Sequence, residues 1–212
     1  MDVVVLGGHG QIARQLLAGL AARGDTARGI VRNPDHADDL RAIGAEPAIG
    51  DVEHESITPL VAGADAVVMA AGAGPGSGPE RKRTVDLGGA LALIDAAKAN
   101  GVARYVVVSA IGASQPESAT GPMGAYLQAK AEADAALVAS GLDFTIVRPG
   151  RLTDDPETGR VEAAERLGRR GSITRADTAA VLLAVLDTPS TIGRTFEVLE
   201  GETPIAEAIA AV

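Results

Sequence analysis

The chain contains no cysteine and no tryptophan, and aromatic residues make up only 2% of its 212 residues. Without cysteine it has no disulfide, no thiolate nucleophile and no zinc–thiolate site, which is compatible with a reducing cytoplasm. Without aromatic side chains it lacks the surfaces on which single-stranded nucleic acids stack. Its net charge of −9 also opposes binding to a phosphate backbone. We therefore expect no nucleic-acid partner.

Long apolar segments are also missing. No run of about 18 apolar residues is present, and no basic amino terminus leads into an apolar stretch with a cleavage site. We therefore expect neither a membrane span nor a signal peptide, and we expect a cytoplasmic location. The residues are 46% hydrophobic and 22% charged, which at this length predicts one domain covering residues 1–212 with a substantial core.

Strand-like apolar runs alternate with helical stretches along the chain. Alternation of this kind predicts an α/β fold with a doubly wound parallel sheet of about seven strands. Continuous apolar runs such as 67–69 and 106–108 are typical of strands whose two faces are both covered by helices. The last run is expected to be an edge strand. The runs lie near residues 2–6, 27–31, 46–49, 66–70, 104–109, 143–148 and 194–199.

The first apolar run leads into a glycine-rich loop that opens an amphipathic helix. Gly7 allows a sharp turn off the strand, Gly10 allows the backbone to approach a phosphate, and Ala13 allows close packing of helix on strand. A tight turn alone would also favour glycine, but the strand and helix on either side favour a dinucleotide pyrophosphate site at the helix amino terminus. The other loop residues expected to contact the cofactor are His9, Gln11 and Ile12.

The residues that follow the second strand favour NADP over NAD. An NAD site usually has an acidic residue there to bind the ribose 2′-hydroxyl, whereas this chain has Arg32 and Asn33. A guanidinium forms a bidentate, charge-assisted contact with a 2′-phosphate; a solvated surface arginine is the alternative. After the third strand, Asp51 and Val52 are placed to meet the adenine, unless Asp51 only caps a following helix.

The acidic run 35–39, which includes His36, invites a metal interpretation. Acidic residues directly after Pro34 are, however, typical of a helix amino terminus, where the positive end of the dipole attracts them. We therefore expect no metal site.

Segment 72–79 is rich in glycine and proline and follows the fourth strand, at the sheet edge where ligands bind. It is either a mobile flap or a plain connector.

A tyrosine and a lysine lie four residues apart in a helical stretch. The chain has only two tyrosines and three lysines, yet Tyr126 and Lys130 share one helix face. The ammonium favours the phenolate form of the tyrosine and lowers its pKa toward working pH, so that Tyr126 can donate a proton to a carbonyl as hydride arrives. Ser109, at the end of the fifth strand, can hydrogen-bond a developing oxyanion. Taken singly, each residue also has a structural explanation: a half-buried tyrosine, a solvated lysine and a serine in a turn.

Motifs along nearly the whole chain match one family pattern. They are Gly7, Gly10 and Ala13, Val31 to Pro34, Gly50 to Val52, Ala70 to Gly72, Tyr105 to Ser109, Tyr126 to Lys130 and Val147 to Leu152. The chain thereby resembles the atypical short-chain dehydrogenase/reductase group, which includes NAD(P)H-binding, epimerase/dehydratase-like and flavin or biliverdin reductase-like proteins. The resemblance implies a Rossmann sheet in the order 3-2-1-4-5-6 with a small C-terminal extension. It further implies cofactor contacts from Ala70, Ala71, Gly72, Lys130, Pro149, Gly150 and Leu152.

The resemblance implies an NADP-dependent oxidoreductase that acts on a small carbonyl, quinone or flavin-like substrate. A redox sensor that binds NADP without turnover and an epimerase-like enzyme are the alternatives. The polar segment within 150–175, with arginines at 160, 166, 169 and 170, is interpreted as a lid over the substrate or as a solvated excursion. The helices near 80–99 and 118–138 suit a monomer or a homodimer.

Overall fold

Nine strands form the central sheet of the computed structural model, which describes residues 1–74 and 76–212. Seven neighbouring strands run parallel, in the order β3-β2-β1-β4-β5-β6-β10. The predicted order 3-2-1-4-5-6 is therefore confirmed. These strands are β1 (Asp2–Leu6), β2 (Thr26–Val31), β3 (Glu46–Ile49), β4 (Ala66–Met69), β5 (Arg104–Val108), β6 (Asp143–Pro149) and β10 (Arg194–Glu200).

The prediction that the last apolar run forms an edge strand is wrong. Strand β8 (Arg160–Ala164) pairs antiparallel with β10, and β11 (Thr203–Pro204) pairs with β8. In β8 only Val161 is buried, so no apolar run marks this strand in the sequence. A separate two-stranded sheet joins β7 (Arg151–Thr153) and β9 (Ser172–Thr174). Part of the polar segment is thus built into the sheet, and its role as a lid stays a prediction.

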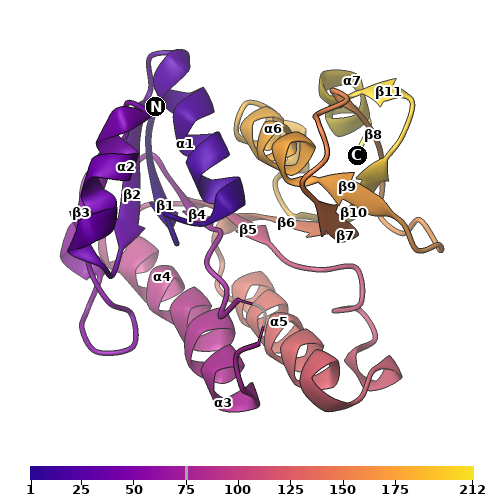
Figure 1. The fold of residues 1–212 in the computed structure, drawn as a ribbon, viewed down its shortest axis with the longest axis horizontal. Helices are drawn as coiled ribbons and strands as arrows, with labels where there is room; N and C mark the ends of the chain where they lie inside the picture. The colour runs from indigo at the N-terminus through magenta and orange to yellow at the C-terminus, as the bar shows by residue number, and fades with distance from the viewer. Residues whose placement is uncertain (75) are drawn as a thin grey trace.

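Helices cover both faces of the sheet (Figure 1). Helices α1 (Gln11–Ala22) and α6 (Arg175–Leu186) lie on one face, and α4 (Gly88–Ala99) and α5 (Gly121–Ala139) lie on the other. Shorter helices are α2 (Ala37–Ala42), α3 (Pro79–Arg81) and α7 (Ile205–Ala210). Among residues 1–74 and 76–212, no helix has the length and apolarity needed to cross a bilayer.

Local sequence signals explain where several helices begin. Leu16 and Leu20 of α1 are fully buried, as the amphipathic pattern predicts. The Thr174 side chain accepts the Asp177 N–H at 2.8 Å and so caps α6. Asn33 caps the helical turn Pro34–His36 in the same way, which supports the helix interpretation of the acidic run.

Strand β1 lies between β2 and β4, so the chain winds outward from it in both directions. This reversal leaves a crevice beyond the carboxyl ends of the two central strands. Gly7, at the end of β1, has a φ of +87°, and a Cβ there would lie 2.6 Å from the Cα of Ala71 at the end of β4. Two backbone segments thus approach each other at the floor of the crevice.

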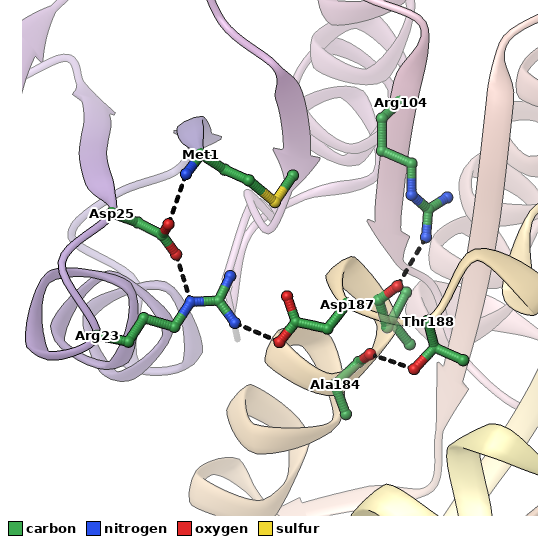
Figure 2. A network of polar contacts seen from close by, with 8 residues as sticks. Met1, Arg23, Asp25, Arg104, Ala184, Asp187 and Thr188 are labelled. Carbon is green, nitrogen blue, oxygen red and sulfur yellow. Dashed lines mark hydrogen bonds and ion pairs between the residues drawn. The ribbon is translucent and has the colours of Figure 1, made fainter.

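Polar contacts at the opposite edge of the sheet join α1 to α6 (Figure 2). Asp25 accepts a 2.6 Å hydrogen bond from the Met1 amino group and also pairs with Arg23. Arg23 in turn reaches Asp187, at 2.5 Å, just beyond the end of α6. Arg104 donates to a backbone carbonyl near the end of α6 at 3.0 Å. These contacts hold the helices in place far from the crevice.

Two glycines with the same backbone conformation allow the close approach at Gly7 to be tested. Gly24 also has a φ of +87°, but a Cβ there meets nothing within 4 Å. We expect Gly24→Ala to lower the free energy of unfolding by about 1–2 kcal/mol through backbone strain alone. Gly7→Ala should cost about 1–3 kcal/mol more, because the methyl group overlaps the Ala71 backbone. Urea unfolding measures both, and equal losses would contradict the assigned close approach.

Candidate cofactor and active site

A cavity of about 400 Å³ lies at the carboxyl ends of β1, β2 and β4. Its volume is in the range found for small-molecule and cofactor sites. Many of the predicted cofactor residues line it: Gly7, His9, Gly10, Arg32, Asp51, Val52, Ala70, Ala71 and Gly72. The crevice between the central strands is therefore an open, lined cavity at the place where the sequence predicts a dinucleotide.

The floor of this cavity is built from backbone. The Gly10 N–H donates to the Gly7 carbonyl at 2.8 Å, and Gly10 is the N-cap residue directly before α1. A Cβ on Gly10 would come within 3.1 Å of the Gly7 oxygen. The first N–H groups of α1 have no partner inside a helix, so they are free to bind an anion. A pyrophosphate fits this cradle because no side chain fills it.

Charged residues surround the outer part of the cavity. Arg32, predicted from the sequence, is 56% exposed, and Arg81, which the sequence analysis missed, is 41% exposed. Both guanidinium groups lie near Glu53, at 3.5 and 3.6 Å. Arg81 is far along the chain from Arg32, and no local pattern links the two. Asp51 does not cap a helix; it accepts the Glu53 N–H in a turn at 3.0 Å.

Other predicted cofactor residues lie outside this cavity. Ile12 is buried in the core under α1, and Asn33 caps the turn after β2. Pro149 and Gly150 lie at the end of β6, where the Gly150 N–H donates to the Val198 carbonyl at 3.1 Å. The cofactor roles of these residues, and of Gln11 and Leu152, stay predictions.

In segment 72–79 the Ser77 hydroxyl donates to the Gly74 carbonyl at 2.8 Å. Pro75 lies outside the described residues.

The predicted Tyr126–Lys130 pair lies on α5 and faces the sheet edge. Tyr126 is half-buried and Lys130 is buried, so Lys130 is not the solvated lysine of the alternative interpretation. Its Nζ donates to the Val108 carbonyl at 3.0 Å and lies 3.5 Å from Asp86 Oδ1. It is also 5.9 Å from the centroid of the Tyr126 ring, while Lys82 Nζ lies 5.1 Å from that centroid. Two of the three lysines thus lie beside the candidate proton donor.

Asp86 is a buried carboxylate that the sequence analysis missed. It lies in the π-helical segment Lys82–Leu87, a type of distortion that is frequent at functional sites. Its Oδ2 accepts the Ala73 N–H at 3.1 Å, and its Oδ1 faces Lys130. Asp86 therefore joins the loop after β4, which lines the cavity, to the lysine of the predicted Tyr126–Lys130 pair.

Ser109, the third predicted catalytic residue, is engaged in a buried polar network. Its hydroxyl donates to Asp134 Oδ2 at 2.9 Å, and Arg148 donates to the same oxygen at 2.9 and 3.1 Å. In this arrangement the hydroxyl proton does not point to a substrate oxygen, and only the lone pairs of Oγ are free. Polarisation of a substrate carbonyl by Ser109 therefore requires the hydroxyl to rotate away from Asp134.

The environment of Asp134 makes its titration informative. Burial raises the pKa of Asp134 above the ordinary value, although Arg148 and Ser109 act in the opposite direction. The folded protein therefore takes up this proton at a higher pH than the unfolded chain does. Protonation of Asp134 therefore stabilises the folded protein. This contribution grows as the pH falls from above the pKa of the folded state to the lower pKa of the unfolded state.

We expect this linkage to appear when the wild type is compared with Asp134→Asn by urea unfolding between pH 7 and pH 4. The variant lacks the titrating group, so the stability of the wild type relative to it should increase as the pH is lowered. A difference that stays constant, or that shrinks toward low pH, would contradict the raised pKa.

Known proteins resemble this chain in both sequence and fold. The family model described as NAD(P)H-binding matches residues 7–189. A Bacillus subtilis protein described as an uncharacterized sugar epimerase is 40% identical over 212 residues, which are 99% of each chain. A solved Bacillus halodurans structure, provisionally described as an NAD-dependent epimerase/dehydratase, has 40% identity and a TM-score of 0.96, with both chains fully covered. A Lactococcus lactis structure described as an oxidoreductase has 26% identity and a TM-score of 0.87, covering 100% of this chain and 96% of that one. The chain belongs to the NAD(P)H-binding family.

Proposed function

We propose that this protein is an NADP-dependent oxidoreductase of the atypical short-chain dehydrogenase/reductase type. In this proposal it transfers hydride between NADPH and a small carbonyl, quinone or flavin-like substrate in the cytoplasm. The observation that carries the proposal is the position of Lys130, which lies between Tyr126 and the loop that lines the cofactor cavity. A lysine placed only for solubility would not be buried against two acceptors.

The chain's own residues provide the steps around the hydride transfer. The nicotinamide, when bound, supplies or accepts the hydride. The Tyr126 hydroxyl holds the proton that a carbonyl oxygen gains on reduction. The Lys130 ammonium, fixed at the end of β5 by the Val108 carbonyl, provides positive charge beside the tyrosine ring and a donor for the cofactor ribose. Asp86 keeps that ammonium in place.

Two arginines at the outer part of the cavity support a preference for NADP. Arg32 and Arg81 place two guanidinium groups there, together with the carboxylates of Glu53 and Asp51. A 2′-phosphate competes with Glu53 for these guanidinium groups, whose planar donors match phosphate geometry.

A second cavity, of about 350 Å³, supports the proposal that segment 150–175 covers the substrate. Glu165 and Arg166 of that segment line it together with Arg148, whose guanidinium also binds Asp134 beside Ser109. Its polar lining suits a small hydrogen-bonding substrate.

An epimerase-like reaction is a second candidate, because the Bacillus subtilis relative is described as a sugar epimerase. Such an enzyme returns the hydride to the substrate, so it consumes no NADPH overall. A redox sensor would bind the nucleotide without any turnover.

Titration with NADPH and NADH tests the cofactor assignment directly, since the absence of tryptophan leaves the cofactor's fluorescence free of that background. We expect tight NADPH binding that Arg32→Ala weakens by about 1.5–3 kcal/mol, because a charge-assisted contact is lost. NADH binding should change much less. Absence of binding for either nucleotide would refute the proposed function.

Turnover separates the candidate functions once a substrate has been found by following NADPH oxidation. We expect Tyr126→Phe to lower the rate of carbonyl reduction by about 10²–10⁴-fold, because the substitution removes the hydroxyl that donates the proton. NADPH affinity should stay nearly unchanged. Unchanged rates would exclude Tyr126 as the acid and would favour quinone or flavin reduction, which needs no protein acid. Conversion of a substrate without net NADPH oxidation would instead favour the epimerase.

A further inference from the structure

Two histidines stack against each other at the cofactor cavity. His9, in the loop after β1, and His36, in the helical turn after β2, have ring centroids 3.6 Å apart and planes that differ by 9°. Both side chains line the cavity, as does Arg32, which comes from the end of β2. His9 belongs to the predicted loop contacts, whereas the sequence analysis assigned His36 to a helix start. The stack therefore holds an unassigned imidazole in the lining of the cavity to which the predicted phosphate-binding arginine also belongs.

One carboxylate, that of Asp39, lies next to this histidine pair. His9 Nε2 lies 2.7 Å from Asp39 Oδ2, and this hydrogen bond lowers the pKa of Asp39, so its carboxylate stays ionised. Arg14 of α1 also faces Asp39. Two imidazolium rings at stacking distance would repel each other. Asp39 also interacts with His36 electrostatically, so the two rings share this one carboxylate, and a phosphate bound against His36 would offset the repulsion between them.

The remaining charged groups at the cavity are Arg32, Arg81, Glu53 and Asp51. Glu53 lies near both arginines, and Asp51 is held in its turn. In the part of the chain that the structure describes, no carboxylate lies within ion-pairing distance of His36, although Asp39, which is bonded to His9, acts on it at longer range. The imidazole is thus free to donate to a ligand.

We propose that His36 is a specificity-determining residue that recognises the 2′-phosphate of NADP(H) together with Arg32. The imidazolium donates to the phosphate, and the His9 ring holds it in position. This inference rests on the proposed preference for NADP. It adds that NADPH binding is coupled to the uptake of a proton near neutral pH, whereas NADH binding is not. Histidine is the side chain whose ordinary titration falls in that range.

The stack has a purely structural alternative, in which His36 only packs against His9. His36→Phe separates the two roles, because phenylalanine keeps a stacking ring but has neither the charge nor the N–H. His36→Gln keeps a hydrogen-bond donor without the charge. His54→Gln is the matched control, since His54 is exposed and does not line the cavity.

The experiment measures the dissociation constants of NADPH and NADH by cofactor fluorescence at two pH values, about 8 and about 6.5. The lower value stays above the region near pH 6 in which a phosphate monoester itself loses charge. We expect wild-type NADPH affinity to be about tenfold higher at the lower pH, as for a gained charge-assisted hydrogen bond. NADH affinity should be the same at both. His36→Phe and His36→Gln should remove the pH effect for NADPH, while Arg32→Ala and His54→Gln should keep it.

Each failure has a separate meaning. If NADPH is preferred but its affinity is independent of pH, or if His36→Phe keeps the wild-type pH effect, the role of His36 is refuted and the proposed function stands. If NADPH and NADH bind equally well, both the NADP preference and the role of His36 fall. If neither nucleotide binds, the proposed function falls with them.

Discussion

The buried ammonium group of Lys130 ties α5 to the carboxyl edge of the sheet. Its nearest acceptors are the Val108 carbonyl at the end of β5 and the Asp86 carboxylate in the π-helical segment. Asp86 also binds the Ala73 N–H beyond β4. A buried charge that loses its partner typically costs about 3–5 kcal/mol. These contacts therefore hold together the helix that carries Tyr126 and Lys130, the end of β5 and the loop after β4.

The two sides of the site differ in how tightly their charged groups are held. Lys130 and Asp86 are desolvated and packed, whereas Arg32 and Arg81 are exposed and share one carboxylate. Replacing an exposed arginine costs the folded protein little stability. Replacing one partner of a buried ion pair leaves the other charge unpaired and destabilises the fold. The proposed nucleotide preference thus depends on groups that can change without loss of the fold, whereas the proposed proton transfer depends on groups that cannot.

Much of the fold was predictable because its signals are local. Each parallel strand is a short apolar run, and the loop from Gly7 to Ala13 joins a strand to an amphipathic helix. Strand β8 was not predictable, because only Val161 of that strand is buried. It depends on pairing with β10 rather than on its own pattern.

The candidate site was predictable only in part, for a similar reason. Tyr126 and Lys130 are four residues apart, so their spacing alone places them on one helix face. Asp86 and Lys130 are in contact although they lie 44 residues apart in the chain. His9 and His36 stack although they follow two different strands, β1 and β2. The donor direction of Ser109 depends on Asp134, which no local pattern relates to it. Contacts of this kind exist only after the sheet has brought distant segments together.

The placement of positive charge at the cavity also affects how a polyanionic nucleotide reaches it. The whole chain carries a net charge of −9, while Arg32 and Arg81 lie at the outer part of the cavity. At low ionic strength the long-range field repels the nucleotide, and contacts at short range attract it. Salt screens the first effect once the Debye length falls to about 8–10 Å, and it weakens the second only at much higher concentration. We therefore expect nucleotide capture to be fastest at an intermediate ionic strength, rather than in dilute buffer.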